Sequence, residues 1–156
     1  MLRTTLRAAI AVAALTTLAL GVTVVVAAPI DRGQTLGVVE RATTDTYVDL
    51  GAAGDSIGDT LAFGNDVYDA SNDHVVGRDE GICFRTNPGL AWECTYTTIL
   101  ADGALTVQGP FYDDLRDSEL SITGGTGRFW NARGELTLHA RNALGTEFDF
   151  AFHIAG

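Results

Sequence analysis

Residues 124–135 read GGTGRFWNARGE, a glycine-rich segment that leads directly into runs of alternating apolar and polar residues. Several glycines permit positive φ angles in a tight connection, and Gly134 allows the next strand to begin close to its neighbour. From this connection, the ring of Phe129 is expected to cap the core. The segment therefore indicates a corner between strands of a mostly antiparallel sheet.

Two strands with clear alternation follow this corner. The runs 133–142 and 146–154 carry an apolar side chain at every second position. These positions are Leu136, Leu138, Ala140, Phe148, Phe150, Phe152 and Ile154. Four bulky apolar groups in a row on the second run must be buried, either inside a barrel or against another subunit. Periodicity alone leaves both arrangements open.

The rest of the chain after residue 28 follows the same pattern of short apolar runs and turns. Gly, Asp or Asn marks nearly every gap between runs, and no stretch carries a sustained helical period. Strands are predicted near 35–41, 44–50, 59–68, 74–86, 91–100, 104–109, 119–123, 133–142 and 146–154. This spacing predicts an all-β domain, either a sandwich or a closed barrel.

The N-terminal segment has the charge order of a secretory signal peptide. Arg3 and Arg7 precede an apolar run that extends from Ala8 to Ala28, and small residues near its end favour cleavage after Ala27. The alternative is an uncleaved membrane anchor, because the run is about as long as the ~20 residues that cross a bilayer. We expect a signal-peptide helix over 1–28, one domain over 29–156, and a secreted protein.

The charge of the chain excludes several classes of partner and mechanism. The net charge is −10, and it becomes −12 when Arg3 and Arg7 leave with a signal that holds no acidic residue. Such a surface repels nucleic acid and anionic lipid headgroups, so neither nucleic acid nor membrane is expected as a partner after signal cleavage. All ten basic residues are arginine, which excludes a Schiff base on lysine. No nucleophile elbow, phosphate loop or dinucleotide fingerprint is present.

The two cysteines are expected to form a disulfide. Cys83 and Cys94 flank the turn signal Asn87-Pro88-Gly89. An exported protein meets oxidising conditions, and a turn here brings the flanking strands side by side within bonding distance. Two thiols alone are too few for a structural zinc site.

Two further groups of polar residues favour solvated positions. His74, His139 and His153 do not form a ligand pattern, so neither a metal nor a cofactor is expected. The charge run 78–80 (Arg-Asp-Glu) beside Gly81 is more typical of a solvated sheet edge than of a ligand-facing wall.

The corner segment resembles the GGTGxFxxARGx motif of dirigent proteins and the related segment of allene oxide cyclases. Three other segments agree with these families in order. Residues 58–69 (GDTLAFGNDVYD) resemble GDxxxFxNxxYD of the cyclases, residues 76–81 (VGRDEG) resemble VGRxxG of dirigent proteins, and residues 106–110 (TVQGP) resemble the VQGP element of the cyclases. The resemblance spans roughly residues 36 to 154 and implies an eight-stranded antiparallel calycin-like β-barrel, commonly a homotrimer in both families.

The resemblance also implies a catalytic role for Glu40. In allene oxide cyclases a glutamate on the first strand handles developing positive charge, while an asparagine and a proline-held water grip the substrate oxygen. Glu40 occupies the comparable place, but Ala42 stands where the cyclases have the asparagine, and the following loop has no matching proline. Cys83 aligns with a pocket cysteine of the cyclases.

Glu40 has two interpretations. Inside an apolar barrel, desolvation would raise its pKa and make it an acid, a base or a carbocation stabiliser. At the rim it would be a solvated carboxylate next to Arg41. Asn65 and Tyr68, like Tyr47, are candidates for contacts to a ligand oxygen, with structural hydrogen bonding as the alternative role.

Phe63 and Phe129 are candidates for the walls that shape a ligand site. The favoured function is a cofactor-free barrel that binds a hydrophobic small molecule and steers its cyclisation or isomerisation. One alternative is a dirigent-type or lipid-binding module with no bond chemistry of its own. The other is a secreted structural protein that self-associates through its Phe-rich face. Whether the chain is an enzyme stays open between these.

Overall fold

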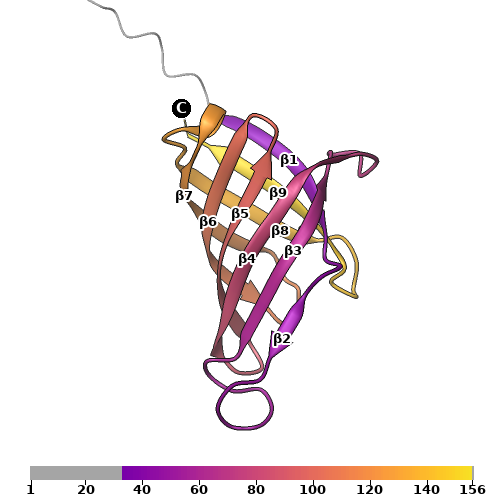
Figure 1. Cartoon of the computed structure of the whole chain (residues 1–156), viewed down its shortest axis with the longest axis vertical. Helices are drawn as coiled ribbons and strands as arrows, with labels where there is room; N and C mark the ends of the chain where they lie inside the picture. Colours follow the sequence, from indigo (N-terminus) through magenta and orange to yellow (C-terminus); the bar gives the residue numbers. More distant parts are fainter. Residues whose placement is uncertain (1–32, 156) are drawn as a thin grey trace, which may run out of the picture.

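The structure is a computed structural model that describes residues 33–155. Within them lie nine β-strands and one short 3-10 helix, η1 (Figure 1). The signal-peptide helix expected over 1–28 falls outside the described residues. The elements are β1 (Gln34–Arg41), β2 (Thr46–Val48), β3 (Thr60–Tyr68), β4 (Val75–Asn87), β5 (Ala91–Leu100), β6 (Gly103–Tyr112), β7 (Ser118–Gly125), η1 (Gly127–Phe129), β8 (Gly134–Ala140) and β9 (Glu147–Ile154).

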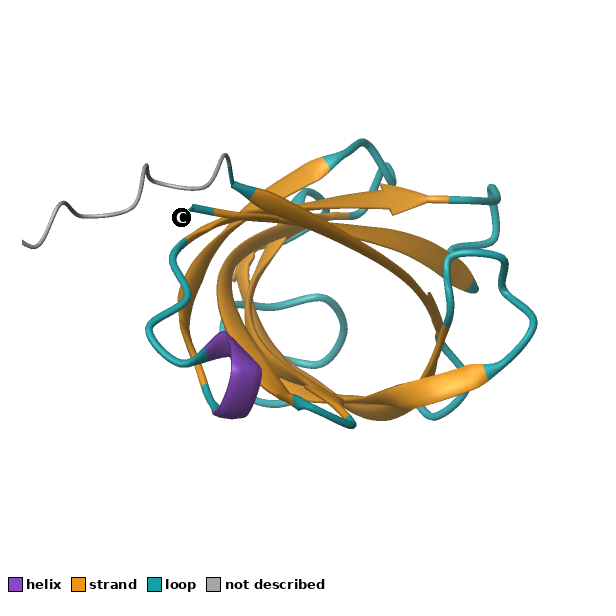
Figure 2. Ribbon diagram, turned by 90° about the horizontal axis from the view of Figure 1, so that it is seen from above, coloured by secondary structure: helices purple, strands orange, loops and turns teal. Residues whose placement is uncertain are grey.

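The strands form one antiparallel sheet that closes on itself. Its order is β1-β9-β8-β7-β6-β5-β4-β3-β2, and β1 also pairs with β3, with Val39 opposite Tyr68. Closure leaves β2 as an extra strand on β3, and Figure 2 shows the ring of strands seen from above. The predicted eight-stranded antiparallel barrel is therefore confirmed, and the sandwich alternative is wrong.

Four predicted strands differ in length by three residues or more from those in the structure. The strands expected at 119–123 and 133–142 are Ser118–Gly125 and Gly134–Ala140. The strand expected at 44–50 is only Thr46–Val48, because the backbone before it binds the Asn65 side chain and the backbone after it turns around Asp59. The strand expected at 104–109 continues through Pro110 to Tyr112. Proline is tolerated there because the register with β7 ends at Gln108, so β6 has a partner on one side only.

The Phe-rich face of β9 points into the barrel. Phe148, Phe150 and Phe152 are at most 6% exposed and belong to one core cluster with Leu136 and Leu138 of β8. The alternation in the sequence thus describes an interior wall. Because these side chains are buried inside the barrel, they do not form an exposed face for the self-association considered as an alternative.

The glycine-rich corner closes one end of the barrel. Gly127 and Gly134 have φ angles of +58° and +136°, and a Cβ on Gly134 would collide with the carbonyl oxygen of His153. The connection carries η1, whose Phe129 is buried in the core cluster. The structure thus places Phe129 as the cap that the sequence predicts.

The expected disulfide is present. Cys83 on β4 and Cys94 on β5 are direct cross-strand partners and are bonded to each other. The turn between the strands lies where Asn87-Pro88-Gly89 predicts it, with the Leu90 amide donating to the Asn87 carbonyl at 3.0 Å.

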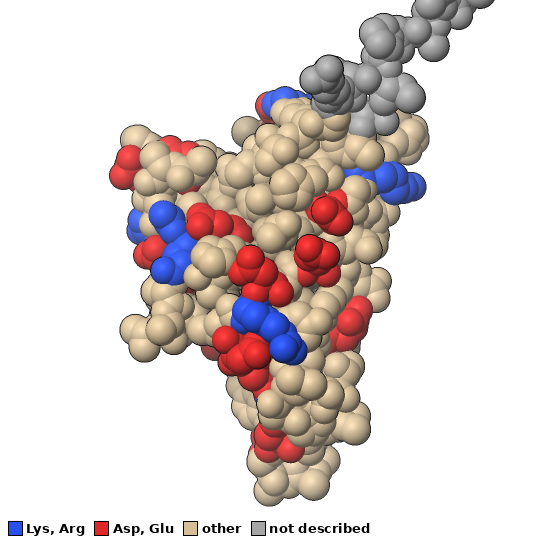
Figure 3. Space-filling view, turned by 180° about the vertical axis from the view of Figure 1, so that it is seen from behind, with Lys and Arg blue, Asp and Glu red and all other residues tan. Residues whose placement is uncertain are grey.

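One face of the barrel, shown in Figure 3, carries carboxylates with arginines among them, amid uncharged residues. Arg78, for example, lies 3.4 Å from both Asp66 and Glu80. Across residues 33–155, no helix has the length and apolar character needed to span a bilayer.

Candidate functional site

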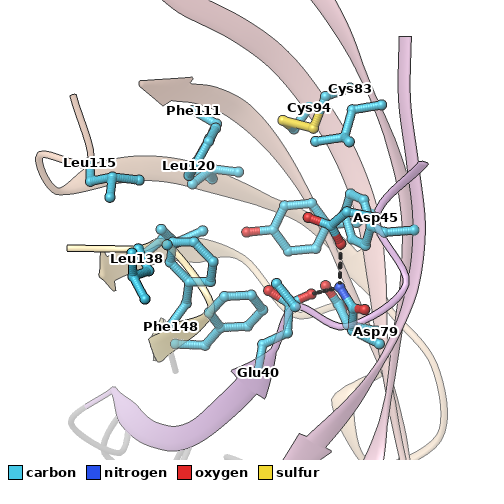
Figure 4. Close-up of a pocket in the computed structure, with 18 residues that line it drawn as sticks. Glu40, Asp45, Asp79, Cys83, Cys94, Phe111, Leu115, Leu120, Leu138 and Phe148 are labelled. Atoms are coloured by element: carbon cyan, nitrogen blue, oxygen red, sulfur yellow. Dashed lines mark hydrogen bonds between the residues drawn. A yellow bond between two sulfur atoms is a disulfide. The ribbon is translucent and has the colours of Figure 1, made fainter. Parts of the chain in front are cut away.

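The barrel contains a cavity of about 220 Å³ whose lining residues lie away from the glycine-rich corner. Its rim is formed by Ala42 after β1, Leu115 in the β6–β7 connection, and Leu144 and Gly145 in the β8–β9 connection. Aromatic and aliphatic side chains make up most of its wall, and the polar members gather on the side of β1, β3 and β4 (Figure 4). An apolar chamber with a few convergent polar groups is the usual form of a small-molecule site.

Glu40 lies in the wall of this cavity at the end of β1. Its side chain is inside the barrel, 5% exposed, and its Oε1 accepts a hydrogen bond from Nδ2 of Asn65 at 2.9 Å. Burial, assisted by the negative charge of Asp79, raises the pKa of Glu40 to about 8. The structure thus favours the interior placement over the rim placement. Arg41 points away, and its Nε donates to Asn72.

Asn65 holds the polar side of the cavity together. Its Oδ1 accepts hydrogen bonds from the amides of Thr43 and Thr44 at 3.0 and 2.9 Å, and its Nδ2 donates to Asp45 as well as to Glu40. Both hydrogens and the carbonyl oxygen are therefore engaged by the protein. Asn65 positions Glu40 and the segment after β1, and it has no free hydrogen to donate to a ligand.

Asp79 of β4 is a second buried carboxyl group in the same wall. It is fully buried, and its Oδ1 accepts a hydrogen bond from Oγ1 of Thr98 at 2.7 Å. Its Oδ2 has no hydrogen-bond partner among residues 33–155. Burial raises the pKa of Asp79 to about 7, although the hydrogen bond from Thr98 opposes the shift.

The sequence interpretation of residues 78–80 as a solvated edge is thus wrong for Asp79. Arg78 and Glu80 do lie on the outer face, whereas Asp79 points inward in phase with Cys83. Counting two residues at a time from Cys83 through Gly81 would have found it.

Tyr96 of β5, like Asp79, is a functional candidate that the sequence did not predict. Its ring packs between Phe63 and Phe150, with centroid distances of 5.9 and 5.7 Å. Its hydroxyl is buried without a partner in the described part of the chain, and burial raises its pKa well above the ordinary value. Gly81 makes room for the ring, because a Cβ there would collide with Cβ of Tyr96. The available signal was its position two residues after Cys94.

The other predicted site residues divide between the cavity and its surroundings. Phe63 lines the cavity, whereas Tyr68 and Phe129 lie outside its lining. Tyr68 stands on the outer face, where the Arg41 guanidinium stacks 3.7 Å from the centre of its ring. Tyr47 is about half exposed and donates to Asp59.

The three histidines lie apart from the cavity and from one another. His74 contacts Asp69, His139 contacts Asp117, and His153 contacts Thr35. In the described part of the chain, no group of three metal-ligating side chains comes together.

Two buried carboxyl groups in one apolar wall can supply both an acid and a base. Because burial and mutual repulsion disfavour double ionisation, the pair keeps a proton near neutral pH and releases it as a coupled unit. The protonated member can donate and the ionised member can accept or stabilise positive charge, which is the requirement for proton transfer or for steering a cationic transition state.

The free energy of unfolding is expected to fall as the pH rises from about 5 to about 8. Over this range folded Glu40 keeps a proton that the unfolded chain, with the ordinary pKa of 4.5, releases. The contribution is fully present below about pH 4.5 and is lost above about pH 8. Glu40→Gln carries no such proton. Over the same pH range its free energy of unfolding should therefore decrease less than that of the wild type, with a difference of at least about 2 kcal/mol. Urea denaturation of both proteins across this pH range measures the difference, and parallel curves would contradict it.

Solved structures share this architecture. A pyocyanin demethylase is similar with a TM-score of 0.65 at 24% identity, covering 76% of this chain and 100% of that chain. A pterocarpan synthase dirigent protein has a TM-score of 0.64 at 18% identity, covering 82% and 99%. An exo-specific intermolecular Diels-Alderase has a TM-score of 0.60 at 12% identity, covering 80% and 98%. At these identities the likeness shows the fold.

The family follows from the sequence match. The model of the allene oxide cyclase family matches residues 34–156, which include every strand of the barrel and all the residues that line its cavity. This chain is therefore a member of the allene oxide cyclase family.

Proposed function

We propose that this chain is a cofactor-free barrel that admits an apolar, reactive small molecule to its cavity and favours one ring closure or isomerisation over the alternatives. The wall would hold the molecule in a shape close to that of the transition state, which lowers the activation free energy of the favoured closure. Glu40 would stabilise charge or move a proton at the reacting centre, with Asn65 holding its carboxyl group in place.

The observation that carries this proposal is a buried, proton-holding carboxyl group in a chamber whose wall is mostly aromatic and aliphatic. Placing Glu40 there opposes stability at neutral pH, and such groups concentrate at functional sites. The aromatic and aliphatic side chains of the wall fix the shape of the chamber. Family membership supports the same function, because the family is named for a cyclase.

A dirigent-type or lipid-binding module remains the second candidate, because the barrel is also similar to dirigent proteins. Such a module would use the same chamber without using Glu40 chemically. The two candidates therefore differ in what the carboxyl group does.

Binding to the chamber can be tested with the neutral fluorescent probe N-phenylnaphthylamine. The wild type is expected to bind it with enhanced fluorescence. Ala42→Trp, at the cavity rim, should block entry and weaken binding at least about tenfold. Ala53→Trp, the same change on an exposed loop, is the matched control and should bind like the wild type. Equal binding by all three proteins would exclude the chamber as the site.

We also propose that residues 1–28 direct export, with cleavage after Ala27, and that the mature barrel forms a homotrimer. The Cys83–Cys94 disulfide supports passage through an oxidising compartment. Mass spectrometry of the exported protein is expected to give a chain beginning at Ala28, and native mass spectrometry three copies. A chain that retains Met1, or a monomer, would contradict the respective statement.

A further inference from the structure

We propose that the chamber selects a ligand with a positive charge on or beside an aromatic ring, and rejects one with a carboxylate. The inference rests on the proposed function, because it concerns the same chamber and specifies the chemical class of its occupant.

The charged side chains that line the chamber are all acidic. Glu40, Asp45 and Asp79 belong to the lining, and none of the lining residues in the described chain is Arg, Lys or His. Above neutral pH, a carboxylate entering this space would meet the negative charge of Asp79 among other acidic groups, with no countercharge in the lining. A cation would meet a complementary charge on Asp79, which is buried and therefore weakly screened.

Two buried polar atoms in the same lining still lack partners. They are Oδ2 of Asp79 and the hydroxyl of Tyr96, on side chains whose residues are 0% and 4% exposed. Oδ1 of Asp79 already accepts from Thr98, so Oδ2 is the atom left to face a ligand. Leaving such atoms unpaired is costly. A protonated nitrogen could donate a hydrogen bond to the carboxylate oxygen, and a quaternary nitrogen would be attracted to it by charge alone.

Aromatic rings surround these acids. Phe63, Tyr96, Phe111, Phe148 and Phe150 all line the chamber. The faces of such rings attract cations and also pack against flat aromatic ligands. Acidic groups combined with several rings therefore favour an aromatic cation over an aliphatic one.

The buried arginine closest along the chain to this wall does not neutralise it. Arg85 lies two residues beyond Cys83 on β4 and is outside the lining. It is paired with Asp55 and Asp113 and stacks on Trp92 at 3.9 Å from the ring centre. Its charge is thus already balanced by two carboxylates of its own.

Three probes of matched shape test the inference on the wild-type protein at about pH 8, where the Asp79 carboxyl is mostly ionised. They are N-methylquinolinium, the neutral methylquinoline, and quinoline carboxylate, each measured by isothermal titration calorimetry. We expect the cation to bind at least about tenfold more tightly than the neutral probe, and the anion to show no binding.

Single substitutions locate the source of the preference. Asp79→Asn should reduce the preference for the cation to about threefold or less while leaving the neutral probe bound. Glu80→Gln is the matched control, because it removes the same charge from the adjacent, outward-facing position. It should leave the preference unchanged, and an equal loss in both variants would overturn the inference in favour of a general surface effect.

The outcomes separate this inference from the proposed function. If the neutral probe binds as tightly as the cation, or the anion binds better, the charge selectivity is wrong while the chamber stands. If none of the three probes binds and N-phenylnaphthylamine also fails to bind, the inference and the proposed function fall together.

Discussion

Replacing Glu40 by Gln is expected to lower the rate of the stereoselective cyclisation that we propose about 100-fold or more. The test molecule for the proposed function is an allene oxide, the compound class in the family's name, supplied without a carboxylate so that no like charge enters the acidic chamber. Uncatalysed closure yields both hands of the product equally, whereas a chamber that holds one conformer yields an excess of one hand. Gln keeps the shape of Glu40 and can still accept from Asn65, but it can neither donate an acidic proton nor carry a negative charge. Chiral chromatography of the product measures both the rate and the excess.

Glu80→Gln serves as the control for this experiment as well, since it changes the same side chain on the outer face of β4. It should behave like the wild type. If Glu40→Gln retains the rate and the product ratio while still binding N-phenylnaphthylamine, the acid or base role is refuted. The dirigent-type alternative would then describe the protein better.

Replacing Phe150 by Ala is expected to destabilise the barrel by about 3–5 kcal/mol. Phe150 is 1% exposed, and its ring contacts both Tyr96 and Phe152, with centroid distances of 5.7 and 6.2 Å. Its removal would lose apolar burial and leave a void that the rigid strands cannot fill. The midpoint of urea denaturation at constant slope measures the change.

The same substitution on the outer face of the barrel gives a matched comparison. Phe84 of β4 is 46% exposed, so Phe84→Ala should cost no more than about 1 kcal/mol. Equal losses at both positions would mean that the interior of the barrel is not packed as the structure shows.

The sequence predicts an antiparallel sheet because most of its strands alternate apolar and polar residues and its corners carry glycines where the backbone needs them. The interior positions of β8 and β9 follow directly from the alternation, and Gly134 adopts the positive φ that the corner requires. The residue pattern alone could not separate a barrel from a sandwich, because closure depends on the long-range pairing of β1 with β3. The family resemblance supplied that distinction.

The polar side of the cavity was harder to predict. Glu40, Phe63 and Asn65 were named from the sequence and do lie together, but the family motif pointed to them more than local chemistry did. Asp79 was hidden in a run of charges, since its neighbours on both sides are solvated. Tyr96 stands in a strand with no motif, and that its hydroxyl is buried without a partner in the described part of the chain follows only from the packing of the folded barrel.

Asn65 is a residue that the sequence named correctly as part of the site but whose role it did not predict. An asparagine near a glutamate suggests contact with a ligand, yet each of its polar atoms is engaged by Glu40, Asp45 or the backbone after β1. The number of hydrogen bonds that a side chain already makes within the protein depends on the fold. Residue spacing in the sequence does not predict it.

A crystal structure of the exported protein with N-phenylnaphthylamine bound tests the central claim most directly. The account predicts electron density for the probe inside the barrel, between the rings of Phe63, Tyr96 and Phe148 and beside Glu40. A barrel whose interior is filled by its own side chains, with the probe on the outer surface, would contradict it.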